Sequence, residues 1–142
     1  MILIDVNVLI YAYNAESPRH GEFRSWLSGV LDGDDPYGYS DLVLSGFVRL
    51  VTHPRVFDPP SELAPALEFA ELNRSSPNAV RITPGDRHWD IFSRLCKASY
   101  ARGNFVADAY HASLAIESGS EWITTDRGFA RFGGLRWRHP LG

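Results

Sequence analysis

Three aspartates stand where the chain could gather carboxylates for chemistry. Asp5 follows the short apolar run Ile2–Ile4, Asp126 follows Trp122–Thr125, and Asp108 lies inside a helical pattern. Two carboxylates about 4 Å apart repel each other by roughly 4 kcal/mol at an effective dielectric constant near 20. Three carboxylates that converge need a compensating charge, and all-oxygen ligands favour Mg²⁺ or Mn²⁺ over zinc. Magnesium held by one or two carboxylates and by water is typical of phosphate chemistry.

The position of Asp108 separates it from ordinary surface acids. It lies three residues after Phe105 and four before Ala112, on the apolar side of its helical pattern. A carboxylate on an inward face must be paired, protonated or bound to a metal. The alternative is a structural aspartate that accepts hydrogen bonds from a turn or an arginine. For Asp5 and Asp126 the alternative is a helix cap or a turn former.

The elements that must position these acids alternate between strand and helix. Short apolar or alternating segments predict the strands, and the carboxyl ends of parallel strands meet at one edge of a sheet, where ligands bind. We therefore expect an α/β fold with a parallel sheet covered by helices on both faces. The predicted strands are Ile2–Ile4, Tyr37–Tyr39, Asn78–Thr83, Trp122–Thr125 and an edge strand at Leu135–Trp137.

Apolar periodicity and caps predict the helices. Ser17-Pro18 indicates the start of a helix whose apolar face runs from Phe23 to Leu31, and Leu42–Val51 predicts a buried helix. A third helix is expected to be capped by Ser61, with an apolar face of Leu63, Ala66, Leu67 and Ala70. A fourth covers Trp89–Tyr100 and is stopped by Gly103, and a fifth covers Phe105–Ser118, capped by Asn104 and closed by Gly119. A short helical turn is expected at Arg127–Phe132.

The composition is that of one globular domain. A length of 142 residues leaves no room for two independent cores, and a net charge of −3 excludes nucleic-acid binding through overall charge. The single cysteine, Cys96, excludes an internal disulfide. No apolar run approaches the roughly 20 residues that span a bilayer, so we expect a cytoplasmic protein. Lys97 is the only lysine, and every other basic side chain is an arginine, which suits two-pronged phosphate contacts.

Three short motifs carry the acids. They are Ile4-Asp5-Val6-Asn7, Phe105-Val-Ala-Asp108-Ala-Tyr-His-Ala112 and Thr124-Thr125-Asp126-Arg127-Gly128-Phe129. In their residues, order and spacing they resemble the motifs of PIN-domain ribonucleases, and most closely those of the VapC toxins of VapBC toxin–antitoxin systems. The resemblance covers essentially the whole chain.

This resemblance implies a single PIN domain over residues 1–142, with a twisted parallel sheet in strand order 3-2-1-4-5. It implies a type II toxin that cleaves RNA of the tRNA or rRNA class endonucleolytically with Mg²⁺ or Mn²⁺, through a metal-activated water. The partners would be a cognate VapB-type antitoxin that neutralises the toxin, the RNA substrate, and a second copy in a homodimer. The catalytic and metal-binding acids of the family fall on Asp5, Asp108 and Asp126, with Asn7 and Thr125 in supporting positions.

One position departs from the family pattern. The family commonly has a glutamate in the helix after the second strand, and counting from Ser40 that slot holds Gly46. Asp41 is the nearest acid, but five helical residues turn the chain by about 500°, so Asp41 would reach the site only from the helix start. The alternatives are a site with fewer acids and more metal-bound water, or a protein that has lost its activity.

RNA reaches an acidic protein only if arginines near the site hold its phosphates. Arg127 and Arg131 follow Asp126 directly and are the first candidates for RNA binding, although each alone can be a solvated surface charge. A second function class is a PIN-like module that binds antitoxin or RNA without cutting. A phosphatase with an Asp-x-Asp motif is excluded because Asn7 stands where its second acid is needed. A phosphoaspartate receiver is excluded because Lys97 lies within a predicted helix.

Overall fold

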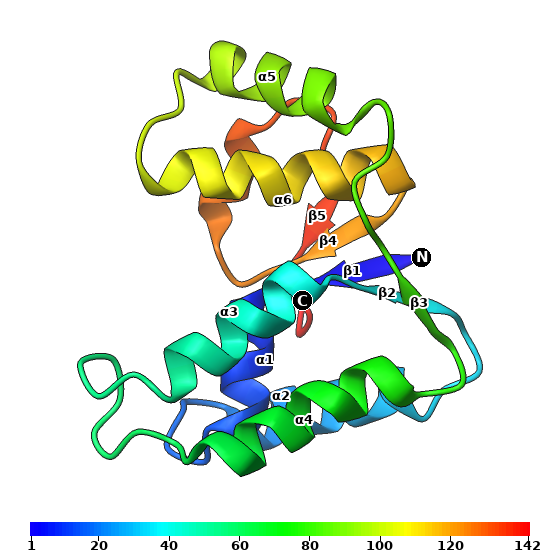
Figure 1. The fold of residues 1–142 in the computed structure, drawn as a ribbon. Coiled ribbons are helices and arrows are strands. Elements are labelled where there is room, and N and C mark those ends of the chain that lie inside the picture. Colours follow the sequence, from blue (N-terminus) through cyan, green and yellow to red (C-terminus); the bar gives the residue numbers. More distant parts are fainter.

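The computed structural model describes residues 1–142, which contain a five-stranded parallel sheet (Figure 1). The strand order is β3-β2-β1-β4-β5, which confirms the expected order 3-2-1-4-5. The central strand is wholly apolar because it has neighbours on both sides and helices over both faces; Leu3 is fully buried. The strands are β1 (Ile2–Ile4), β2 (Tyr37–Tyr39), β3 (Ala79–Arg81), β4 (Glu121–Ile123) and β5 (Trp137–Arg138).

Helices cover the sheet in two groups. In Figure 1 the helices α5 and α6 lie side by side on one side of the strands, and α1, α2, α3 and α4 lie on the other. None of the helices combines the length and the apolar character needed to span a bilayer. The bounds are α1 (Val6–Tyr13), α2 (His20–Leu31), α3 (Asp41–Val51), α4 (Leu63–Ser75), α5 (His88–Ser99), α6 (Asn104–Ser118) and a 3-10 helix η1 (Arg127–Arg131).

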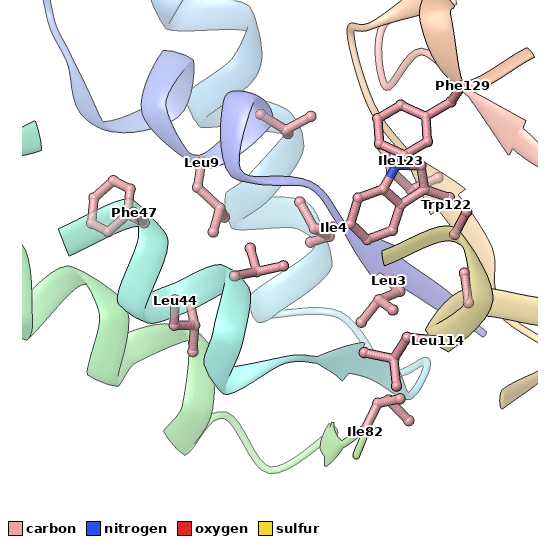
Figure 2. Close-up of a cluster of buried hydrophobic side chains, with 14 of the residues drawn as sticks. Leu3, Ile4, Leu9, Leu44, Phe47, Ile82, Leu114, Trp122, Ile123 and Phe129 are labelled. Carbon is pink, nitrogen blue, oxygen red and sulfur yellow. The ribbon is translucent and has the colours of Figure 1, made fainter. Parts of the chain in front are cut away.

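One hydrophobic core joins the two helical groups through the central strands (Figure 2). Leu3 of β1 and Trp122 of β4 are fully buried in this core, which also contains Phe47 of α3 and Leu114 of α6. Burial of each side chain of this size contributes roughly 1.5–3 kcal/mol to the stability of the fold. The core therefore holds β1 and β4 in place and, with them, the ends of both strands. The position of those two strand ends decides where Asp5 and Asp126 lie.

Several local predictions were wrong or incomplete. Helix α2 does not start at Ser17-Pro18, because it begins at His20 after Arg19 in the left-handed conformation, with no side-chain cap. Helix α1 was not predicted, because its residues are apolar on most sides and follow β1 with only Asp5 between them. Helix α5 ends at Ser99 with Tyr100 in the left-handed conformation (φ 52°), so Gly103 does not stop it. Gly103 instead precedes α6 with φ 59° and ψ −130°, and Asn104 is the first residue of α6 and not its cap.

The predicted apolar face of α4 is only half correct. Ala66 and Ala70 are buried, whereas Leu63 and Leu67 are 58% and 50% exposed. The helix packs through its small residues, which lets its backbone approach the core closely and turns the leucines outward. Ser61 does not cap α4 either; its hydroxyl shares a 2.7 Å hydrogen bond with the hydroxyl of Tyr13.

Candidate active site

Asp5 lies at the carboxyl end of β1 with only 5% of its surface exposed. Its Oδ1 accepts a hydrogen bond from the backbone N of Val6 at 2.7 Å, which caps the start of α1. Its Oδ2 accepts from Thr124 Oγ1 at 2.7 Å and from Asn7 Nδ2 at 3.0 Å. Three donors therefore hold this carboxyl group in one orientation.

Thr124 connects Asp5 to the second acidic segment. Its fully buried hydroxyl donates to Asp5 and accepts from the backbone N of Asp126 at 3.0 Å. Asn7 extends the network, since its Oδ1 accepts from the backbone N of Thr125 at 3.1 Å. Thr125 thus supports Asn7 through its backbone, and the side chain in contact with Asp5 belongs to Thr124.

Sequence analysis missed Thr124, although the motif Thr124-Thr125-Asp126 contained it. Which of the two threonines faces Asp5 depends on the pairing of β1 with β4, in which Ile4 lies opposite Ile123. A one-residue change in that register would exchange the two side chains.

The charges of the three aspartates interact in the fold. The pKa of Asp5 is raised to about 6, chiefly by burial; the hydrogen bonds from Thr124 and Val6 oppose the shift, and the charges of Asp108 and Asp126 add to it. Burial also raises the pKa of Asp108, followed by the charge of Asp126. The structure therefore brings together the three acids that were predicted from separate parts of the chain.

Arg131 is the cation beside these acids. Its charge lowers the pKa of Asp108, and its guanidinium carbon lies 3.5 Å from the centre of the Phe105 ring. Its Nε donates to the carbonyl oxygen of Gly128 at 2.8 Å. Gly128 leaves room for this turn, since a Cβ atom there would lie 2.9 Å from both Arg131 Nη2 and Asp126 Oδ1. The side chain of Arg127 is exposed and makes no hydrogen bond or ion pair within the chain.

Asp41 is not part of this group. Its carboxylate accepts from Arg74 Nε at 2.8 Å and pairs with Arg81 Nη2 at 3.3 Å. It is not among the charges that shift the pKa of Asp5 or Asp108. The geometry therefore gives no support to the idea that Asp41 replaces the acid missing at Gly46.

Gly46 faces a cavity of about 720 Å³ beside the acids. The wall includes Val6 and Ala107, the chain neighbours of Asp5 and Asp108, and a Cβ atom at Gly46 would have no neighbour within 4 Å. His111 also lines the cavity; burial lowers its pKa to about 4, and its ring stacks on Trp122. A longer side chain at position 46 would therefore extend into this open cavity.

The carboxylate oxygens of Asp5, Asp108 and Asp126 are of the type that binds a hard divalent cation, although the three side chains do not lie close enough together to enclose one. No group of three acidic, histidine or cysteine side chains lies close enough to form a complete metal site. Asp5 uses three of about four acceptor positions of an ionised carboxylate, which leaves one free. Asp108 accepts no hydrogen bond, so both of its oxygens are free. Mg²⁺ commonly takes one or two carboxylates and keeps several waters, so free oxygens such as those of Asp5 and Asp108 are of the kind that it binds.

Comparison with known proteins places the chain in a family. The family model described as "PIN domain" matches residues 2–135. The chain belongs to the PIN-domain family. Ribonuclease VapC43 of Mycobacterium tuberculosis is 44% identical over 141 residues, which cover 99% of this chain and 96% of that protein. This PIN domain is therefore a relative of proteins named VapC ribonucleases.

Solved structures agree with the fold of this PIN domain. The VapBC-1 structure from nontypeable Haemophilus influenzae matches with a TM-score of 0.71 and 15% identity, covering all of both chains. VapC20 of M. tuberculosis, described as a Sarcin-Ricin loop cleaving toxin, matches with a TM-score of 0.65 and 17% identity over 96% of this chain and 99% of that one. The shared α/β architecture is thus retained at low sequence identity.

The raised pKa of Asp5 predicts how the stability of the metal-free protein depends on pH. Because the pKa is about 6 in the folded state and 3.8 in the unfolded chain, the folded state holds this proton more tightly. The resulting stability is fully present below about pH 4 and is lost as pH rises through 6, amounting to about 3 kcal/mol. Denaturant unfolding in EDTA between pH 4 and pH 7.5, compared with Asp5→Asn, measures this contribution. An Asp5 carboxyl that titrates near 4 by NMR contradicts the prediction, even if Asp5→Asn fails to fold.

Proposed function

We propose that this protein is a Mg²⁺- or Mn²⁺-dependent endoribonuclease and the toxin of a type II toxin–antitoxin pair. The observation that carries the proposal is the electrostatic coupling of Asp5, Asp108 and Asp126 at the carboxyl ends of β1 and β4. Asp5 caps α1 and Asp126 caps η1, but three coupled acids still cost stability unless a cation compensates them, and this cost favours a bound cation. Membership of the PIN-domain family and the names of its relatives as ribonucleases support the same activity.

Asp5 and Asp108 would hold the cation, and Asp126 would be a further ligand or orient a water. When bound, Mg²⁺ or Mn²⁺ supplies polarisation of a phosphate oxygen and a bound water of lowered pKa. Thr124, Asn7 and Val6 keep the Asp5 carboxylate fixed, so its orientation does not have to be established during the reaction. With water as nucleophile, the products carry 5′-phosphate and 3′-hydroxyl ends.

Arg127 and Arg131 are the proposed contacts to the RNA backbone close to the acids. Arg131 lies beside Asp108, and the side chain of Arg127 has no partner within the chain. The substrate is proposed to be a structured RNA of the tRNA or rRNA class. Support for the ribosomal alternative comes from VapC20, which is described as cleaving the Sarcin-Ricin loop.

The proposed partners follow from the same relatives. VapBC-1 of H. influenzae is named as a VapBC assembly, so we propose a VapB-type antitoxin as the partner of this chain. We also propose a homodimer and a cytoplasmic location. A second candidate function is binding of antitoxin or RNA without cleavage, and the observation that favours it is the glycine at position 46, where the family commonly has an acid.

Cleavage of purified total RNA separates the two functions. We expect discrete fragments with Mg²⁺ or Mn²⁺ and none with EDTA. We expect Asp108→Asn to lower the cleavage rate at least about a hundredfold, because substitution of residues that only support a metal ligand already lowers activity or metal affinity 10- to 100-fold. Asp108 is half-buried and accepts no hydrogen bond, so asparagine should leave the melting temperature nearly unchanged. The ends of the fragments are read by sequencing.

Arg94→Gln is the matched control for that assay, because Arg94 is exposed on α5 and makes no ion pair. Cleavage that persists in EDTA, or fragments ending in 2′,3′-cyclic phosphate, would contradict a metal-activated water. Intact tRNA and rRNA in every lane, despite metal binding, would favour the binding module.

Substitution at Gly46 tests whether a side chain at this position, in the cavity beside α3, reaches the proposed metal site. Gly46→Glu would add a carboxylate on the cavity side of α3, and we expect it to lower severalfold the Mn²⁺ concentration needed for half-maximal cleavage. Gly46→Gln, which has the same shape without the charge, should not change that concentration. Both variants should raise helix stability by up to about 1 kcal/mol, because glycine is unfavourable inside a helix. Equal metal dependence of the two variants would show that position 46 does not face the cation.

A further inference from the structure

A second pocket, beside β5 (Trp137–Arg138), is lined by cations. Its volume is about 570 Å³, and its only apolar wall residue is Trp137. No aspartate or glutamate side chain lines it, which is unusual in a chain of net charge −3. The other side chains of the wall are Arg19, Thr125, Arg127, Arg138 and His139.

Several hydrogen-bond donors in this pocket are not used by the protein. The guanidinium of Arg127 and the hydroxyl of Thr125 have no hydrogen-bond partner within the chain. Arg138 binds Glu121 through Nε at 2.8 Å, and Arg19 pairs with Glu22 through Nε, so the terminal nitrogens of both remain free. The free donors of these four side chains all belong to the wall of this one pocket.

His139 adds a donor of fixed orientation. Its Nδ1 accepts the backbone N–H of Leu141 at 3.1 Å. In the neutral ring the proton is therefore on Nε2, which makes no other hydrogen bond.

The pocket is joined to the acids by Thr125 and Asn7. The backbone N of Thr125 donates to Asn7 Oδ1, and Asn7 Nδ2 donates to Asp5 Oδ2. Arg127 follows Asp126 directly in the chain. A strand whose phosphate lies at the acids can therefore place a neighbouring phosphate in this pocket.

We propose that the pocket of Arg19, Thr125, Arg127, Arg138 and His139 binds one backbone phosphate of the RNA, next to the one that is cut, and so sets the register of cleavage. The proposal rests on the proposed ribonuclease function and specifies how its substrate is held. Arginine forks and a hydroxyl match the oxygens of a phosphodiester, and contacts to phosphate fix position without reading sequence. Trp137 gives the pocket an apolar wall for the sugar or base attached to that phosphate.

A scan of neutralised phosphates tests this directly. Short single-stranded RNAs, each with one phosphate replaced by an uncharged methylphosphonate, are titrated with the full chain in EDTA, so that binding is measured without cleavage. We expect one position to weaken binding at least about tenfold more than the others, because the methylphosphonate removes a charge-assisted hydrogen bond there. Equal effects at all positions would overturn the proposal.

Variants then assign that position to the pocket. The double variant Arg127→Gln/Arg138→Gln should bind the unmodified RNA about as weakly as the natural chain binds the RNA with the sensitive methylphosphonate. A methylphosphonate at that position should then weaken binding to the double variant no more than one at any other position. The slope of log Kd against log salt should fall by about 0.7 for each phosphate that the variant no longer neutralises. Thr125→Val should show a smaller effect at the same position, and Arg94→Gln should show none. Retention of the sensitive position in the double variant would overturn the proposal.

Cleavage by the same variants distinguishes failure of the pocket proposal from failure of the proposed ribonuclease function. If Mg²⁺-dependent cleavage persists with unchanged ends in Arg127→Gln/Arg138→Gln, the activity stands and the pocket has no role in register. If the sensitive phosphate is found but no RNA is cut, the pocket stands and the activity fails. A polyglutamate peptide of equal charge that binds more tightly than the RNA, with the same dependence on Arg138, would assign the pocket to a protein partner instead.

Discussion

The candidate site depends on the hydrogen bonds that tie the end of β1 to the end of β4. Thr124 donates to Asp5 and accepts from the backbone of Asp126, so one buried hydroxyl sets the relative position of two acidic segments. Without these bonds, a carboxylate that is 5% exposed would lack the donors that make its burial tolerable. The parallel pairing of β1 with β4 places the two ends side by side, and helix α6 brings Asp108 to the same edge.

Charge is distributed unevenly around this edge of the sheet. The cavity at Gly46 on α3 is mostly apolar, whereas the pocket beside β5 is lined by arginines. Arg131 packs against Phe105 and lies close to Asp108. A cation bound at the acids would lower the local negative charge, so the proposed metal would strengthen the attraction of an RNA strand to the proposed phosphate contacts.

The parallel sheet and the three candidate acids could be predicted from local patterns in the sequence, whereas the strand order came from the resemblance to the PIN-domain family. A short apolar run ending in Asp5 and a helical stripe interrupted by Asp108 are visible without a structure. Thr124 was not predicted, since its role depends on the register between β1 and β4, which lie near opposite ends of the chain. The pairing of Asp41 with Arg74 and Arg81 was equally hidden, because it joins α3 to α4 and β3. Tyr100 in the left-handed conformation replaced the glycine that the usual helix stop predicts.

We propose above all that Asp5 and Asp108 share one divalent cation. Crystals of the protein grown at pH 7.5 with Mn²⁺, measured for anomalous scattering, would locate the ion without reference to activity. We expect one Mn²⁺ peak with carboxylate oxygens of Asp5 and Asp108 as ligands, and no such peak in Asp108→Asn. A peak held by other residues, or no peak at a Mn²⁺ concentration that supports full cleavage, would contradict it.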